Sequence, residues 1–319
     1  MKQWDVVALG ELLIDFTENG KSEQGNPLLE ANPGGAPCNV LAMLNKLGRK
    51  TAFIGKVGRD SFGRQLAEAV KESGTDLSGL VYDEKVHTTL AFVHTLGDGE
   101  REFSFYRNPG ADMMLTKEEV KEELLKNTKI FHFGTLSSTH KGVREATRYA
   151  VQTAKENGAL ISFDPNLREP LWDSLEDARR EIAYGLSQCD ILKISDNELE
   201  FMTGTTDYEK GVAQLREEYD IPLVFLTLGK DGSRAYYRDF RAEQPTFQEI
   251  RPVEKTGAGD TFEGCALGWL LEKGMDSLNN ETLSQLLRFA NAGASLVTTR
   301  KGALRVMPEK AEIEALLDH

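Results

Sequence analysis

The chain has few cysteines, no long apolar run and no Gly-x4-Gly-Lys-Ser/Thr loop. Its three cysteines, Cys38, Cys189 and Cys265, lie far apart in apolar surroundings, so we expect reduced core thiols rather than disulfides. No uncharged stretch reaches the roughly 20 residues that span a bilayer, and the N-terminus lacks the apolar region of a signal peptide. We therefore expect no membrane association and a cytoplasmic location. The missing loop excludes a P-loop nucleotide site.

Positive charge is also scarce, because 38 Lys and Arg face 51 Asp and Glu for a net charge of −13. Such a chain repels polyphosphate backbones, so we expect no nucleic-acid binding. The five histidines form no ligand pair at helical spacing. His132 alternates with Phe131 and Phe133, which predicts a hydrogen-bonded histidine on a strand. The length of 319 residues and the 40% hydrophobic content are typical of one large α/β domain or two modest ones.

From Ile130 onward, predicted strands and helices alternate. Strands at Ile130–Gly134, Leu160–Asp164, Ile191–Ile194 and Leu223–Leu228 are separated by helical segments. This alternation predicts a mostly parallel sheet covered by helices on both faces. Ligands of such sheets bind at the carboxyl ends of the strands, so we expect Asp164, Lys193 and Thr227 near one site.

The N-terminal part mixes this pattern with hairpin signals. Trp4–Gly10 and Thr51–Val57 are predicted strands of the main sheet, whereas 18–33 is polar and rich in turn residues. Thr88–Leu96 and Arg101–Arg107 are predicted strands joined by Gly97-Asp98-Gly99. We therefore predict an α/β core from 1–11, 33–86 and 110–319, with a small β-rich flap from 12–32 and 87–109.

The stretch Thr256-Gly257-Ala258-Gly259-Asp260 precedes an apolar helix and carries the most specific chemistry. Glycines at a helix start let backbone N–H groups approach an anion such as phosphate. A carboxylate beside that anion, here Asp260, is suited to act as the base that accepts a proton from an attacking hydroxyl. Asp260 is equally compatible with a stabilising carboxylate in the first turn. Gly34-Gly35, at an earlier helix start, fits either close backbone approach to a ligand or a tight turn.

Three stretches in order resemble the ribokinase-like (PfkB) carbohydrate kinases: Gly34-Gly35-Ala36-Pro37-Cys38-Asn39, Asn197-Glu198-Leu199-Glu200 and the Gly-Ala-Gly-Asp element. The resemblance covers Trp4 to Pro308. It implies a Rossmann-like αβα sandwich with a small β-sheet lid over the sugar, and a homodimer formed through that lid. The flap predicted above fits such a lid.

Within that family, 105–112 and 164–172 resemble the fructokinases. The resemblance implies transfer of the γ-phosphate of ATP to the 6-hydroxyl of D-fructose, with Mg²⁺ as cofactor. The alternative within the family is a kinase for another sugar or nucleoside, such as aminoimidazole riboside or 2-keto-3-deoxygluconate. A non-catalytic sugar sensor and a dinucleotide-dependent oxidoreductase are alternatives from other classes. The presence of Asp260, Asn197 and Glu200 disfavours the sensor, because a binding module has no use for a base and a metal motif together. Gly257, Gly259 and Gly264 lack the Gly-x-Gly-x-x-Gly spacing of dinucleotide-binding proteins, since position 262 is Phe, and this disfavours the oxidoreductase.

The resemblance also implies residue roles for the sugar and for catalysis. Asp260 matches the catalytic base, and the backbone of Gly257, Ala258 and Gly259 matches the anion hole. The sugar-binding positions are Asp15, Gly34, Gly35, Asn39, Arg107 and Arg168. A carboxylate such as Asp15 can accept from two neighbouring hydroxyls, and a guanidinium suits hydroxyl or phosphate oxygens. A surface ion pair is the ordinary alternative for either arginine.

A second set of matching positions concerns ATP and cations. Asn197 and Glu200, on one face of a helix turn, match a motif that organises Mg²⁺ through water, although they also suit a plain helix start. The remaining ATP-binding positions are Lys193, Thr227, Gly229, Gly232 and Asn291. Glu254-Lys255 replaces an Asp-Thr pair found in many relatives. Because that region helps several members bind a potassium-type cation, potassium activation is left open.

Overall fold

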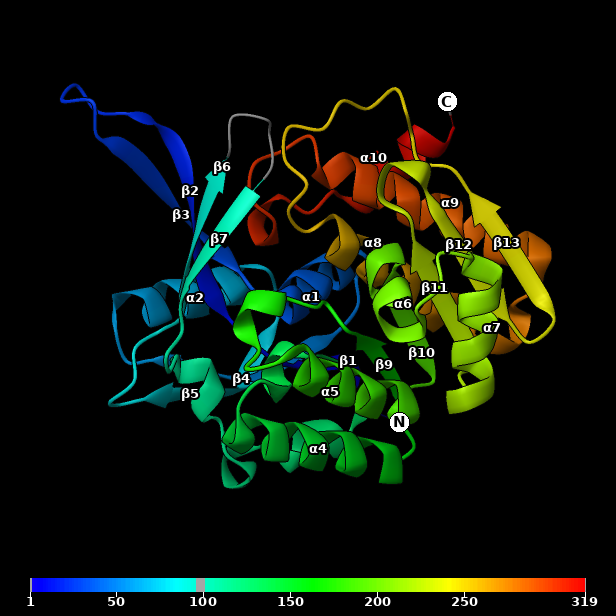
Figure 1. Cartoon of the computed structure of the whole chain (residues 1–319), viewed down its shortest axis with the longest axis horizontal. Coiled ribbons are helices and arrows are strands. Elements are labelled where there is room, and N and C mark those ends of the chain that lie inside the picture. Colours follow the sequence, from blue (N-terminus) through cyan, green and yellow to red (C-terminus); the bar gives the residue numbers. More distant parts are fainter. Residues whose placement is uncertain (1, 96–100, 319) are drawn as a thin grey trace.

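The computed structural model describes residues 2–95 and 101–318 and contains two separate sheets (Figure 1). The large sheet has nine strands in the order β13-β12-β11-β10-β9-β8-β1-β4-β5. Its strands from β5 to β11 run parallel, and the antiparallel hairpin of β12 and β13 closes one edge. The predicted mostly parallel sheet is therefore confirmed. The strand bounds are β1 Trp4–Leu9, β4 Thr51–Gly58, β5 Asp76–Asp83, β8 Thr128–Gly134, β9 Leu160–Asp164, β10 Ile191–Ser195, β11 Leu223–Thr227, β12 Ser233–Tyr237 and β13 Phe240–Gln244.

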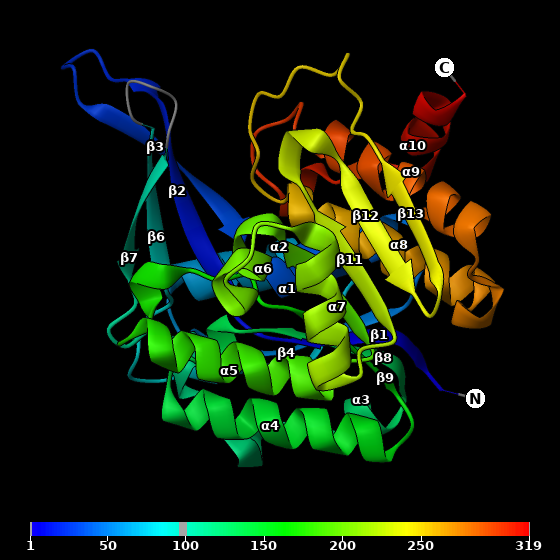
Figure 2. The same ribbon diagram turned by 45° about the vertical axis from the view of Figure 1, so that its right-hand side comes forward.

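Helices cover both faces of this sheet, because apolar residues point alternately to either side of each buried strand. In β1, Val6 belongs to one apolar core and its neighbour Val7 to the other. The layers lie on opposite sides of the sheet in Figure 2. One contains α1 Ala36–Lys46, α2 Ser61–Glu72, α8 Ala258–Lys273, α9 Asn280–Val297 and α10 Lys310–Leu317. The other contains α3 Glu122–Lys126, α4 Lys141–Glu156, α5 Leu175–Gln188, α6 Asp196–Thr203 and α7 Tyr208–Tyr219.

The small sheet has the order β3-β2-β6-β7 and projects from the main body (Figure 1). Its strands are β2 Leu13–Lys21, β3 Pro27–Gly34, β6 Leu90–Thr95 and β7 Arg101–Tyr106. The hairpin strands β6 and β7 pair antiparallel, as expected. The predicted Gly97-Asp98-Gly99 turn lies outside the described residues.

The structure defines the strands within 18–33, which the sequence marks only as polar, turn-rich and part of the predicted β-rich flap. This segment forms the outer half of β2 and nearly all of β3. Its residues are largely exposed on both faces, so no apolar alternation marks them as strands. Their conformation comes instead from pairing with each other along the hairpin.

Among the described residues, no helix is long and apolar enough to cross a membrane. All three cysteines are buried free thiols, as expected.

Candidate active site

Asp260 lies in the first turn of α8, directly after an unusual helix start. The N-cap residue Gly257 has φ of 77°, and a Cβ built there would lie 2.6 Å from Ala303 Cβ. Only glycine therefore fits this position without strain. Its carbonyl accepts hydrogen bonds from the N and Oγ1 atoms of Thr261, at 2.8 and 2.7 Å. These bonds fix the turn, and the first amides of α8 remain without intrahelical carbonyls, as at any helix start.

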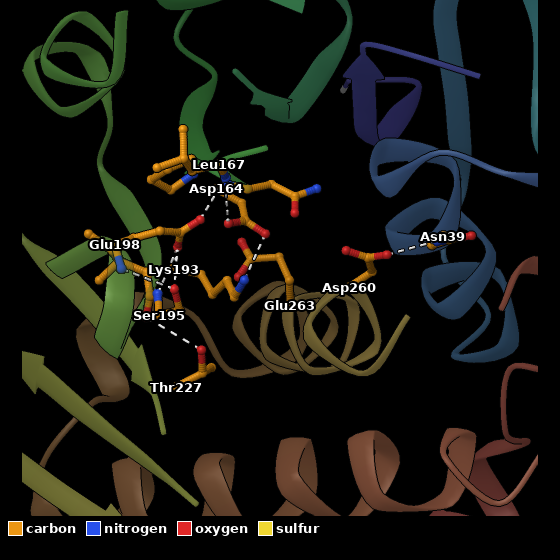
Figure 3. Close-up of polar contacts among 12 residues, drawn as sticks. Asn39, Asp164, Leu167, Lys193, Ser195, Glu198, Thr227, Asp260 and Glu263 are labelled. Atoms are coloured by element: carbon orange, nitrogen blue, oxygen red, sulfur yellow. Dashed lines mark hydrogen bonds and ion pairs between the residues drawn. The ribbon is translucent and has the colours of Figure 1, made fainter. Parts of the chain in front are cut away.

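A hydrogen bond from α1 orients the Asp260 carboxylate. Asn39 Nδ2 donates to Asp260 Oδ2 over 2.7 Å (Figure 3). The two helices approach closely because α8 presents Gly264 to α1, where a Cβ would lie 2.7 Å from Met43 Cβ. Burial raises the pKa of Asp260 to about 6, the Asn39 hydrogen bond opposes that rise, and the Asp164 charge adds to it. Asp260 is therefore mostly ionised at neutral pH but readily accepts a proton.

A buried ion pair lies at the carboxyl ends of β9 and β10. Lys193 Nζ contacts Asp164 Oδ2 at 2.9 Å, and both side chains are almost fully buried (Figure 3). Burial alone would lower the pKa of Lys193, but the charges of Asp164, Glu198 and Asp260 and the Asp164 hydrogen bond together outweigh it, and the net shift is upward. A Cβ on Gly259 would lie 3.2 Å from Lys193 Nζ, so this ammonium adjoins the first turn of α8. The backbone amides at the start of α8 and the Lys193 ammonium thus form one anion-binding site.

The other wall of the cleft comes from the small sheet and from the entrance of α1. Burial raises the pKa of Asp15, on β2, to about 7; Arg168 opposes the rise, and Glu254 and Asp260 add to it. A Cβ on Gly34 would lie 2.3 Å from Asp15 Oδ2, and one on Gly35 would lie 2.4 Å from the Glu11 carbonyl. Gly35 is thus needed for close packing against the backbone, whereas a side chain at Gly34 would displace the Asp15 carboxylate. The cleft is lined by Glu11, Leu13, Asp15, Gly35, Ala36, Asn39, Phe105, Leu136, Asn166, Arg168, Lys193, Lys255, Thr256, Gly257, Gly259 and Asp260.

Arg107, expected near the sugar, lies outside this lining. Its guanidinium is buried and pairs with Asp112, with Nη2 2.6 Å from Oδ2. Further bonds reach Thr139 Oγ1 at 2.8 Å and the Leu136 carbonyl at 2.9 Å. Since Leu136 itself lines the cleft, Arg107 supports the wall from behind.

Lys193 lines the cleft, whereas the other predicted nucleotide positions are not part of its lining. Asn197 and Glu200 are exposed on α6, which begins where β10 ends. Their oxygen atoms suit Mg²⁺ held through water. Within residues 2–95 and 101–318, no group of three or more His, Cys, Asp and Glu side chains is placed to bind a metal ion. Thr227 ends β11, and Gly229 and Gly232 flank the turn that follows it.

Asn291, expected at the adenine, has a structural use in α9. Its Oδ1 accepts from Ser233 Oγ at 2.9 Å, and its Nδ2 donates to the Gln244 and Pro245 carbonyls at 3.1 and 3.2 Å. The side chain therefore fixes the end of β13 relative to β12. A Cβ on Gly232 would lie 2.1 Å from the same Gln244 carbonyl, so the two predicted positions share one packed region.

Sequence reasoning missed two buried acids. Glu11 lines the cleft, and its Oε1 accepts a 2.8 Å hydrogen bond from Ala36 N at the start of α1. Burial raises its pKa to about 7. Glu263, one turn beyond Asp260, is fully buried and accepts a 2.7 Å bond from Ser162 Oγ. Neither belongs to a recognised motif; the only signal was a charged residue among apolar neighbours.

Comparison with known proteins identifies a group of enzymes with this architecture. The sequence model of the pfkB family of carbohydrate kinases matches residues 3–310. Fructokinase-1 of Zea mays is 43% identical over 315 residues, which cover 98% of this chain and 97% of that protein. The crystal structure of fructokinase with bound ATP from Xylella fastidiosa superposes with a TM-score of 0.90 at 31% identity, covering 98% of both chains. A fructokinase from Vibrio cholerae O395, crystallised with fructose, ADP and calcium ion, has a TM-score of 0.87 at 31% identity, with 98% and 99% coverage.

Proposed function

This chain belongs to the pfkB family of carbohydrate kinases, and from that premise we propose that it transfers the γ-phosphate of ATP to the 6-hydroxyl of D-fructose. One observation carries the catalytic part of this proposal. The half-buried Asp260 carboxylate is held by Asn39 in the cleft that Asp15 also lines, beside the glycine-rich start of α8. A base, a place for hydroxyl groups and a place for phosphate are thus adjacent. The Zea mays and Vibrio cholerae relatives support fructose as the sugar.

The chemical step needs a positioned acceptor and stabilisation of the transferred charge. The oxygen of the 6-hydroxyl forms a bond to the γ-phosphorus, and the bond between that phosphorus and the β–γ bridging oxygen breaks to release ADP. Asp260 takes the hydroxyl proton. The Gly257, Ala258 and Gly259 backbone and the Lys193 ammonium stabilise the negative oxygens. Since this work requires little covalent chemistry, the geometry of these few groups provides most of the catalysis.

Sugar binding is assigned to Asp15, Gly34, Gly35, Asn39 and Arg168. Asp15 and Phe105 come from different strands of the small sheet and both line the cleft, which supports a lid role for that sheet. Such a lid would exclude water, which otherwise competes with the sugar as phosphoryl acceptor. Arg107 contributes by fixing the Leu136 side of the cleft.

ATP binding is assigned to Lys193, Asn197, Thr227, Gly229, Gly232 and Asn291. Asn197 and Glu200 would hold Mg²⁺ through its water ligands, and the ion would neutralise phosphate charge.

Glu254 accepts bonds from Thr256 Oγ1 at 2.7 Å and from Gly302 N at 3.0 Å, and Lys255 lines the cleft. The use of a potassium-type cation is tested by comparing turnover in potassium chloride and in tetramethylammonium chloride.

The small sheet also suits a homodimer interface. Leu28 and Leu29 on β3 and Tyr106 on β7 are 47%, 40% and 68% exposed, and large apolar side chains on such strands favour association. Light scattering is expected to give the dimer mass, and Leu28→Ser with Leu29→Ser is expected to shift it toward the monomer. A monomer at all concentrations contradicts the interface. Reaction in the cytoplasm stays a prediction from the sequence.

A panel of acceptors tests the substrate. Fructose, glucose, mannose, ribose, 2-keto-3-deoxygluconate and aminoimidazole riboside are each incubated with Mg-ATP, and ADP release is followed. We expect the highest kcat/KM with fructose, and a product whose phosphorus couples to the protons on carbon 6. Preference for the riboside or the keto-acid contradicts the substrate assignment while leaving the family unchanged.

A further inference from the structure

A chain of three buried polar side chains lies beside the catalytic groups and has no part in the mechanism above. His132 Nδ1 is 2.9 Å from Ser162 Oγ, which in turn is 2.7 Å from Glu263 Oε1. His132 is 2% exposed, and the other two side chains are fully buried. In Figure 3, Asp260 points toward Asn39, whereas Glu263 leaves the same helix toward Asp164 and Lys193. Glu263 therefore lies where its charge acts on the phosphate-binding cation.

The second carboxyl oxygen of Glu263 indicates which charge state the fold accepts. Oε2 is buried and has no hydrogen-bond partner among the described residues. An ionised carboxylate with one unsatisfied buried oxygen is strongly unfavourable, whereas a protonated carboxyl is far less so. Burial accordingly raises the pKa of Glu263 to about 8; the Ser162 hydrogen bond opposes this rise, and the Asp164 charge adds to it.

The surrounding groups do not supply a dedicated counter-charge. Lys193 Nζ makes its 2.9 Å contact with Asp164 rather than with Glu263. Burial lowers the pKa of His132 to about 3, so this ring stays neutral. Asp260 is a second acid on the same helix, and the buried Cys189 thiol, its pKa raised mainly by burial, stays protonated. Among the neighbouring groups in the described residues, Lys193 is the cation that attracts an ionised Glu263, and it is already paired with Asp164.

Hydrogen positions along the chain agree with a neutral acid. The Ser162 hydroxyl donates to Glu263 Oε1, and a neutral His132 with its proton on Nδ1 donates in turn to Ser162 Oγ. A proton on the unpartnered Oε2 then leaves Glu263 neutral, so this chain of side chains buries no charge. The network thus binds a proton one helical turn from Asp260.

We propose that Glu263 is a positioning residue that works in its neutral form. While protonated, it leaves the Lys193 ammonium to Asp164 and to the ATP phosphates; when it ionises, it competes for Lys193 and weakens ATP binding. This role rests on the proposed function, because it takes Lys193 as the phosphate-binding cation. It also restricts efficient turnover to pH values at which the buried acid keeps its proton.

Glu263→Gln tests the proposal because the amide imitates the neutral carboxyl in shape and charge. Glu272→Gln, near the exposed end of the same helix, is the matched control. In the wild type and the control, the KM for ATP is expected to rise about tenfold from pH 7 to pH 9, as one group with a pKa near 8 ionises. In Glu263→Gln the KM is expected to stay nearly constant. An unchanged alkaline rise in Glu263→Gln, or a tenfold loss of kcat/KM at pH 7, overturns the proposal.

Thermal unfolding gives a readout that needs no substrate. The folded pKa of about 8 exceeds the 4.5 of an exposed glutamate, so the folded state binds this proton more tightly. The resulting stabilisation is lost as pH rises from 4.5 to 8. The Tm of Glu263→Gln minus that of the wild type should therefore increase across this range. A Tm difference that stays constant or decreases from pH 4.5 to pH 8 contradicts the proposal, whereas failure of wild-type turnover with fructose contradicts only the proposed function.

Discussion

Asn39 and Asp260, 221 positions apart in the chain, are joined by a 2.7 Å hydrogen bond between Nδ2 and Oδ2. The bond crosses from α1 to α8 where glycines let the two helices pack closely. It orients the carboxylate and stabilises its charged form against burial. The first prediction concerns its effect on the pH dependence of catalysis.

The acid limb of kcat should depend on Asn39. Asp260 accepts a proton only when ionised, so wild-type kcat is expected to fall as pH drops below about 6. Asn39→Leu removes the hydrogen bond that opposes the raised pKa, and the limb should move to higher pH. Asn45→Leu is the control, because Asn45 lies on the same helix but bonds Thr75 Oγ1 at 2.8 Å. An acid limb that is the same in both variants contradicts the assignment.

Lys193 should be needed for ATP beyond its part in stability. Lys193→Met leaves Asp164 buried without its partner, which costs about 3–5 kcal/mol of unfolding free energy. Lys56→Met is a matched control, because Lys56 is equally buried and pairs with Asp83 at 3.2 Å and Glu119 at 2.8 Å. Calorimetry should find both variants destabilised, with ATP binding lost only in Lys193→Met. Equal ATP affinity in the two folded variants contradicts the role.

Gly257 should tolerate no side chain, for two separable reasons. Gly257 and Gly204, the C-cap of α6, both have left-handed backbones with φ of 77° and 70°, but of the two only Gly257 has a neighbour, Ala303, with which a Cβ collides. Gly204→Ala therefore measures the left-handed backbone cost alone, about 1–2 kcal/mol. Gly257→Ala should lose more stability and also most of kcat, because the collision displaces the anion hole. Equal effects of the two substitutions in denaturant titration and kinetics contradict this interpretation.

Removing the base should stabilise the protein while it stops the reaction. The folded pKa of Asp260, about 6, exceeds the 3.8 of an exposed aspartate, so its contribution to stability is lost as pH rises between these values. Asp260→Asn does not titrate and should have the higher Tm at neutral pH. A lower Tm than wild type, with an unchanged circular dichroism spectrum, contradicts the raised pKa.

The sequence predicted the layers and the start of the helix that carries Asp260, because both depend on local patterns. Alternating buried strands and helices indicated the parallel sheet, and the Gly-Ala-Gly-Asp element indicated the start of α8. The individual strands within 18–33 could not be located, since they are held by pairing with each other rather than by an apolar pattern of their own.

The hydrogen-bond and ion-pair partners of buried side chains were the other feature that the sequence could not predict. The family resemblance implies ligand contacts for Arg107 and Asn291, and only the fold shows their functional groups bonded to Asp112 and to Gln244. Glu11 and Glu263 were missed for the same reason. Their burial follows from helices that meet far along the chain, and no single segment encodes it.

The most direct test of the central claim is the turnover of Asp260→Asn with fructose and Mg-ATP. The claim is that Asp260 takes the proton of the sugar hydroxyl, so kcat should fall by about 10²–10⁴ while the KM for fructose and the fold stay close to those of the wild type. Near-wild-type turnover of the folded variant would contradict the claim.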